Sequence, residues 1–272
     1  MKLFFARSYK LFKRVHLIIT ALAIITIVIL FLLKGIGLSL MYGFVTYISL
    51  RIIASYLINI KDNKEFNNLL SILYDSRTPF EFLKVINAEI DYSLLDKEQT
   101  TTLLIHRANA LSFSGEFDAA NEILDTLEAK LNIQDSDKLL ILNNKVTFSL
   151  LEKAFGEREL NENIFNYSIR KLEDSDSPYI NNSIQDQIIY KIINNIKLTN
   201  VEIDDLWLFI KHSGSTLNKE TLYYFASIHL LHEGDRKGAI EELQQINIAG
   251  GNTVVQRGAA NYLEELRENE QK

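Results

Sequence analysis

The chain has no cysteine, and only two prolines and 11 glycines occur among its 272 residues. Without cysteine there are no disulfides and no metal sites built from thiolates. Proline and glycine interrupt helices, so their scarcity leaves long segments that can stay helical. Alternation of apolar and polar residues, the mark of half-buried strands, is also rare. Apolar residues instead recur at helical spacing, as at Phe66, Leu69 and Leu73, so the sequence predicts an all-α fold.

The first 60 residues contain no aspartate or glutamate, although they carry seven lysines and arginines. The other 212 residues carry 22 basic and 35 acidic side chains, so the two parts have net charges of +7 and −13. This asymmetry predicts a basic, apolar segment suited to lipid, followed by a charged segment suited to water. We therefore divide the chain into a basic N-terminus (1–16), a membrane segment (17–60) and a helical domain (61–272).

Two apolar stretches make up the membrane segment. Residues 17–33 are uncharged and, at about 1.5 Å per helical residue, come near the lower limit for crossing about 30 Å of hydrocarbon. Residues 36–60 form the second stretch, in which Arg51 is the single charge. The first stretch lacks a small-residue cleavage site and is soon followed by the second, which disfavours a cleaved signal peptide. The sequence predicts a transmembrane hairpin of two helices.

Basic residues predict the orientation of this hairpin. Five of them precede the first stretch, Lys34 alone lies between the stretches, and Lys61 and Lys64 follow the second. Because lysine and arginine are enriched on the cytoplasmic side of membrane proteins, both ends of the hairpin are expected in the cytoplasm. If only the first stretch crosses, the acidic domain lies outside instead.

Arg51 is an intramembrane polar residue with three interpretations. It lies nearer to the end of the second stretch than to its start, so its side chain can reach the interface between lipid and water. It can also pair with an acidic residue in a partner's membrane helix. In the third interpretation the second stretch lies along the interface and never crosses.

Two segments of the helical domain repeat each other around a glycine, Gly115 in one and Gly234 in the other. Each has a small residue seven positions before the glycine, an alanine five after it, and aliphatic residues nine and twelve after it. These residues are Ala108, Ala120, Leu124 and Leu127 in the first segment and Ser227, Ala239, Leu243 and Ile246 in the second. The pattern predicts two helices that pack closely on either side of a glycine turn.

Both segments resemble the tetratricopeptide repeat, a two-helix unit of about 34 residues. Leu104 and Tyr223 stand at the motif's early tryptophan position, and its terminal proline is absent. The resemblance implies a TPR-like α-solenoid in which the first helix of each pair lines a groove for a peptide or helix. It places the partner-binding groove at Ile105, Asn109, Tyr224 and Ile228. Three of these four favour an apolar or amphipathic helical partner, although all four can instead pack against neighbouring helices.

Further helices are expected between and after these two segments. We interpret Gly156 as a third turn. The last helix would be the C-terminal cap that a solenoid needs. The expected helices span residues 139–155, 159–172, 179–197, 201–212 and 252–269.

Motifs for catalysis are absent, since the sequence has no GxSxG, P-loop, GxGxxG or HExxH pattern. His229 and His232 lie three residues apart, but no other ligand stands at a zinc-site spacing. We therefore expect no enzyme, no metal and no cofactor. The charge of −13 after residue 60 repels nucleic acid, so the expected partners are a protein and the lipid bilayer.

Two functions remain as hypotheses. The first is a multi-pass scaffold of a bacterial inner membrane, whose cytoplasmic solenoid binds a protein partner such as an amphipathic helix or a subunit of a membrane complex. The bacterial origin is suggested by a composition rich in isoleucine, asparagine and lysine. The alternative is a membrane-resident protective factor, such as an immunity protein against a secreted toxin, that acts through its hairpin.

Overall fold

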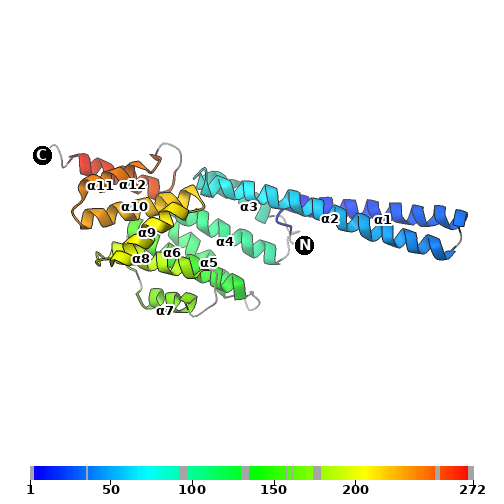
Figure 1. Cartoon of the computed structure of the whole chain (residues 1–272), viewed down its shortest axis with the longest axis horizontal. Coiled ribbons are helices and arrows are strands. Elements are labelled where there is room, and N and C mark those ends of the chain that lie inside the picture. The colour runs from blue at the N-terminus through cyan, green and yellow to red at the C-terminus, as the bar shows by residue number, and fades with distance from the viewer. Residues whose placement is uncertain are drawn as a thin grey trace. The chain divides into compact units, whose positions relative to one another are not determined.

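The computed structural model describes residues 3–34, 36–91, 97–129, 135–156, 158–160, 162–173, 179–248 and 252–268. Within these ranges the regular structure is entirely helical, which confirms the predicted all-α fold (Figure 1). The helices are α1 (Ala6–Lys34), α2 (Ile36–Tyr74), α3 (Pro79–Ile90), α4 (Lys97–Ser114), α5 (Phe117–Glu128), α6 (Asp135–Phe155), α7 (Glu162–Glu173), α8 (Ile180–Ile193), α9 (Asn200–His212), α10 (Thr216–His232), α11 (Arg236–Gln244) and α12 (Val254–Glu268).

The chain forms two compact units. The first comprises Met1–Leu69 and Asn87–Leu103, and the second comprises Leu70–Ile86 and Leu104–Lys272. Helix α2 continues through residue 60 to Tyr74, so no helix end marks the boundary that the sequence predicts there.

In the first unit, α1 and α2 form an antiparallel hairpin. The His16 ring lies 3.4 Å from the Ser55 hydroxyl, and nearer the far end Gly43 packs directly on Ile27. A Cβ atom at Gly43 would come within 2.2 Å of the Ile27 side chain, so only glycine permits this close approach. The buried residues of the hairpin include Ile19, Ala23 and Ile58.

At its base the hairpin is closed by a carboxylate. Asp62, which is fully buried on α2, accepts hydrogen bonds from the backbone N–H groups of Phe4 and Phe5 at 2.5 and 3.3 Å. These groups lie just before α1 begins, where a helix N-terminus favours negative charge. The Phe4 ring also stacks on Phe66 with 3.9 Å between centroids. The start of α1 is therefore held by the part of α2 beyond the second apolar stretch.

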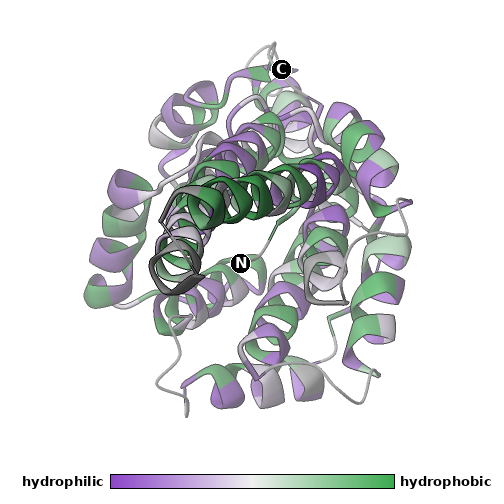
Figure 2. Cartoon of the chain, turned by 90° about the vertical axis from the view of Figure 1, so that its right-hand side faces the viewer, coloured by the Kyte–Doolittle hydropathy of each residue, from purple (hydrophilic) through white to green (hydrophobic). Residues whose placement is uncertain are grey.

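Most apolar side chains of the hairpin point outward. The segments Ala6–Leu32 and Met41–Tyr74 are long and apolar enough to cross a membrane, and only 11% of the most apolar window in each is buried. Large aliphatic and aromatic side chains such as Leu17, Leu32 and Phe44 are more than half exposed. Helices of the second unit carry green hydrophobic and purple hydrophilic residues side by side, as expected for amphipathic helices facing water (Figure 2).

In the second unit each helix from α5 to α10 packs on the next one in the chain, and α6, α8 and α10 also pack on one another in that order. The two glycine turns lie where the sequence predicts them, between α4 and α5 and between α10 and α11. Gly115 has a φ of 97° and Gly234 a φ of 83°, a left-handed conformation that favours glycine. They are the only glycines with positive φ among the described residues, so Gly156 does not form a third turn of this kind.

Close packing beside the two turns also agrees with the sequence pattern. The small residues Ala108, Ala120, Ser227 and Ala239 are all completely buried. The aliphatic residues that follow each turn are buried as well, namely Leu124 and Leu127 after the first turn and Leu243 and Ile246 after the second. The two repeated segments thus place the same positions of the pattern in the core.

The C-terminal helix α12 packs against α6, α10 and α11. Its start is fixed by Thr253 and Gln256, each of which accepts a hydrogen bond from the backbone N–H of the other. Arg257, one residue later, donates from Nη2 to the Ser114 carbonyl oxygen at 2.8 Å. This last helix is therefore joined to the end of α4 as well as to α10.

Candidate binding cavities

A polar cavity of about 280 Å³ lies in the second unit. Its walls come from α4, α6, α8 and α10, together with Tyr74 at the end of α2 and Tyr179 just before α8. Counting pairs from α4, these four are the first helices of successive pairs (Figure 1). One cavity therefore brings together residues that lie more than 100 positions apart in the sequence.

Amide side chains line this polar cavity from each of the four helices. They can both donate and accept hydrogen bonds, and none carries a charge. The amides are Asn109 on α4, Asn143 and Asn144 on α6, Asn182 and Gln185 on α8, and Asn218 on α10.

Three of these amides are buried and only partly hydrogen-bonded. Asn109, Asn143 and Asn144 are 9%, 6% and 8% exposed. Asn109 donates from Nδ2 to the Tyr74 hydroxyl at 2.9 Å. Within the part of the chain that the structure describes, the Oδ1 atoms of Asn109 and Asn143 and the Nδ2 atom of Asn144 are buried without a hydrogen-bond partner. Because a buried polar group without a partner costs free energy, these atoms are suited to a ligand.

The cavity's ionisable groups are held neutral by burial. Burial raises the pKa of Asp186 on α8 to about 8, while a hydrogen bond from the Thr147 hydroxyl acts in the opposite direction. Burial lowers the pKa of His106 on α4 to about 4. At neutral pH the carboxyl group is therefore mostly protonated and the imidazole is uncharged.

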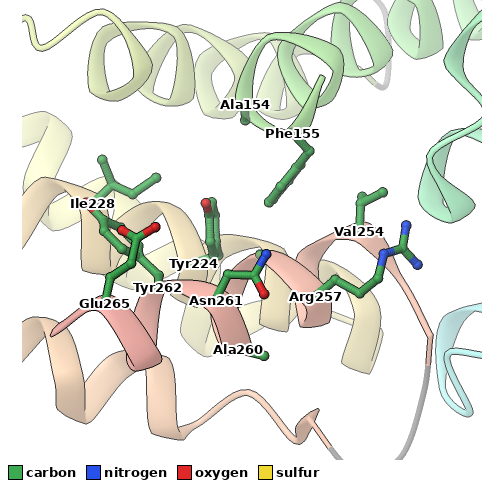
Figure 3. A pocket seen from close by; sticks show the side chains of 11 residues that line it. Ala154, Phe155, Tyr224, Ile228, Val254, Arg257, Ala260, Asn261, Tyr262 and Glu265 are labelled. Atoms are coloured by element: carbon green, nitrogen blue, oxygen red, sulfur yellow. The ribbon is translucent and has the colours of Figure 1, made fainter. Parts of the chain in front are cut away.

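A second depression, the aromatic cleft, has a volume of about 650 Å³ and lies among the end of α6, α10 and α12 (Figure 3). Phe155 projects from the end of α6 toward Tyr224, with 4.7 Å between ring centroids, and Tyr262 lies 6.5 Å from Tyr224. Gly258 permits this arrangement, since a Cβ atom there would come within 2.5 Å of the Phe155 ring. Burial raises the pKa of Tyr224 to about 12.

The four predicted groove residues do not share one cavity. Ile105 and Asn109 line the polar cavity, whereas Tyr224 and Ile228 line the aromatic cleft. On α10 the residues that reach the polar cavity are Asn218, Thr221 and Phe225, which sequence reasoning missed. Their spacing of three and four residues would have marked a helix face, and the asparagines along α4, α6 and α8 were a further signal.

Arg51 is exposed on α2 and donates from Nη1 to the Tyr47 hydroxyl at 3.3 Å. Because His16 faces Ser55 in the antiparallel hairpin, Arg51 lies about level with Thr20 on α1. This level is close to the basic end of the first apolar stretch, so in a membrane-spanning hairpin the arginine side chain would have only a short distance to reach water.

Comparison of the chain with models of known protein families, with curated proteins and with solved structures finds no match.

Proposed function

We propose that this protein is a membrane-anchored adaptor whose second unit is a TPR-like solenoid that holds an extended segment of a partner protein in its polar cavity. The amides that line this cavity from four successive first helices are the observation that carries the proposal. An extended peptide presents an N–H and a C=O group at each residue, and amide side chains can bind both.

This partner differs from the apolar or amphipathic helix expected from the sequence. Tyr224 and Ile228, which motivated that expectation together with Ile105, line the aromatic cleft instead. A helix satisfies its own backbone hydrogen bonds internally and would leave the buried amides of Asn109 and Asn143 without partners. An extended segment can provide those partners.

The membrane anchor in this proposal is the hairpin of α1 and α2. Its outward-facing aliphatic side chains favour lipid, because an apolar surface of this extent is rare on proteins that face only water. The positive-inside rule orients it with both ends in the cytoplasm of a bacterium. The partner segment is then captured next to the inner membrane.

Photo-crosslinking with the full chain in its native membrane tests the proposal. A photoreactive amino acid at Asn182, which lines the polar cavity and is exposed, should cross-link to a discrete partner. Combining it with Asn109→Ala and Asn143→Ala should remove this product, since the amides that hold the partner's main chain are lost. The same photoreactive residue at Asn166, exposed on α7, is the matched control and should give no such product.

A cross-link from Asn182 that is unaffected by the two alanine substitutions would contradict binding through the amides. Absence of any product from Asn182, with the chain correctly inserted in the membrane, would favour the hairpin as the functional part.

A further inference from the structure

Asp186 is buried at the polar cavity, where few groups could stabilise its ionised, negatively charged form. It is 1% exposed, and the Thr147 hydroxyl donates to its Oδ2 atom over a long distance of 3.4 Å. The described residues that line the cavity include no lysine and no arginine. The other titratable groups around the cavity are His106 on α4, Tyr74 and Tyr179, which are neutral near pH 7. A buried carboxyl group without a cationic partner costs stability, so its presence needs a reason.

Among the described residues, two of the three buried amide atoms without a partner at this cavity are acceptors. The Oδ1 atoms of Asn109 and Asn143 have no donor within the described part of the chain, and the carboxyl group of Asp186 adds further acceptor capacity. Asn144 contributes the one donor among these atoms, its Nδ2 amide nitrogen. An ammonium group has three N–H donors and a guanidinium group five, and neither has an acceptor. The cavity thus fits a cation better than a neutral amide.

We propose that the polar cavity binds a lysine or arginine side chain of the partner's extended segment, with Asp186 as its counter-ion and the oxygens of Asn109 and Asn143 as additional acceptors. This inference rests on the proposed function and names the side chain that the same site selects. The cavity volume of about 280 Å³ is near the lower end of ligand pockets, which suits one side chain rather than a folded element. The net charge of −13 beyond residue 60 also attracts a basic segment.

Binding of the cation is coupled to the release of a proton. With a pKa of about 8, the carboxyl group of Asp186 is mostly protonated at pH 7. A nearby positive charge favours the ionised form, so the proton leaves when the basic side chain enters. A neutral side chain of the same length would enter without this release.

Selection from a random hexapeptide library tests the inference, with the full chain in lipid nanodiscs as the target. Enriched peptides should share a lysine or arginine, and replacing that residue by norleucine should weaken binding at least about tenfold. In Asp186→Asn the lysine and norleucine peptides should bind almost equally. Calorimetry of the lysine peptide in phosphate and Tris buffers should show proton release by the natural chain and none by Asp186→Asn.

Asp204→Asn, which removes an exposed carboxylate of α9, is the matched control and should keep the preference for the basic peptide. Enriched peptides without a basic residue, or an unchanged preference in Asp186→Asn, would overturn this inference and leave the proposed function standing. Failure to enrich any peptide would count against the proposed function itself, and therefore against both.

Discussion

At the scale of single residues, Asp186 makes the stability of the folded chain depend on pH. Its pKa is about 8 in the folded chain and 3.8 in the unfolded one, because burial disfavours the charged carboxylate. Between these values the folded chain binds more protons, so the free energy of unfolding falls as pH rises. The protonated carboxyl group makes its full contribution to the free energy of unfolding below pH 3.8. This contribution is lost once the pH has risen past 8.

Asp186→Asn should therefore be more stable than the natural chain at pH 8 and closer to it at pH 5. Each unit of pKa shift corresponds to about 1.4 kcal/mol, so the gain at pH 8 should be a few kcal/mol. Urea unfolding followed by fluorescence of Trp207, the single tryptophan, measures it at both values. Equal stability of the two proteins at pH 8 would mean that Asp186 is hydrated and not buried.

A second residue-scale prediction concerns the buried ion pair of Arg77 and Glu220. Both side chains are almost fully buried, and the carboxylate of Glu220 also accepts the backbone N–H of Asn247 at 3.1 Å. Glu220→Ala leaves the Arg77 charge buried alone and should cost about 3–5 kcal/mol in urea unfolding. Arg77→Met combined with Glu220→Leu removes both charges and should cost less. A larger loss in the double variant would show that the pair stabilises more than an apolar replacement does.

At the scale of elements, the two glycine turns allow the cost of backbone strain to be told apart from the cost of steric crowding. Gly115 and Gly234 both have positive φ, but a Cβ atom at Gly115 would also lie 3.1 Å from Val254, whereas Gly234 has open space. Gly214 has neither constraint and serves as the control. Alanine should be nearly neutral at Gly214, cost about 1–2 kcal/mol at Gly234, and cost more at Gly115. Equal effects at all three positions in urea unfolding would contradict the two left-handed turns.

Much of the fold could be predicted because glycine turns and small residues leave a clear pattern. The expected helix at 201–212 is α9 (200–212), and the expected terminal helix at 252–269 is α12 (254–268). The passage of α2 through residue 60 was missed, because a change from apolar to charged composition looks like a boundary although the backbone stays helical. Hydropathy reports the surroundings of a helix and not its end.

The candidate site was less predictable for a physical reason. Position by position, Tyr224 on α10 corresponds to Ile105 on α4, yet the first lines the aromatic cleft and the second the polar cavity. Helix α12 packs on α10 and contributes Gly258 and Tyr262 to the cleft. A repeat pattern gives the same face to equivalent helices, but it does not show which neighbour covers that face in each pair.

At the scale of the whole molecule, charge and hydropathy together predict the side of the membrane on which each part lies. All seven charged side chains in the first 60 residues are cations, and five of them precede the apolar part of α1. Lys61 follows the apolar part of α2, in which Arg51 lies close to that same end of the hairpin. The positive-inside rule therefore predicts that this basic end stays on the cytoplasmic side and that the opposite end, which has Lys34 as its one cation, is translocated.

Thiol labelling tests this topology, since the chain has no cysteine of its own. Gly214→Cys places a thiol at an exposed position before α10 where a Cβ atom meets no neighbour, so the fold should tolerate it. A membrane-impermeant maleimide should leave this thiol unlabelled in intact cells and label it after permeabilisation. Gly35→Cys, between the two apolar stretches, is the control and should react in intact cells. Strong labelling of Gly214→Cys in intact cells would mean that only one stretch crosses. The adaptor would then meet its partner outside the cytoplasm, because an odd number of crossings reverses the side of everything that follows.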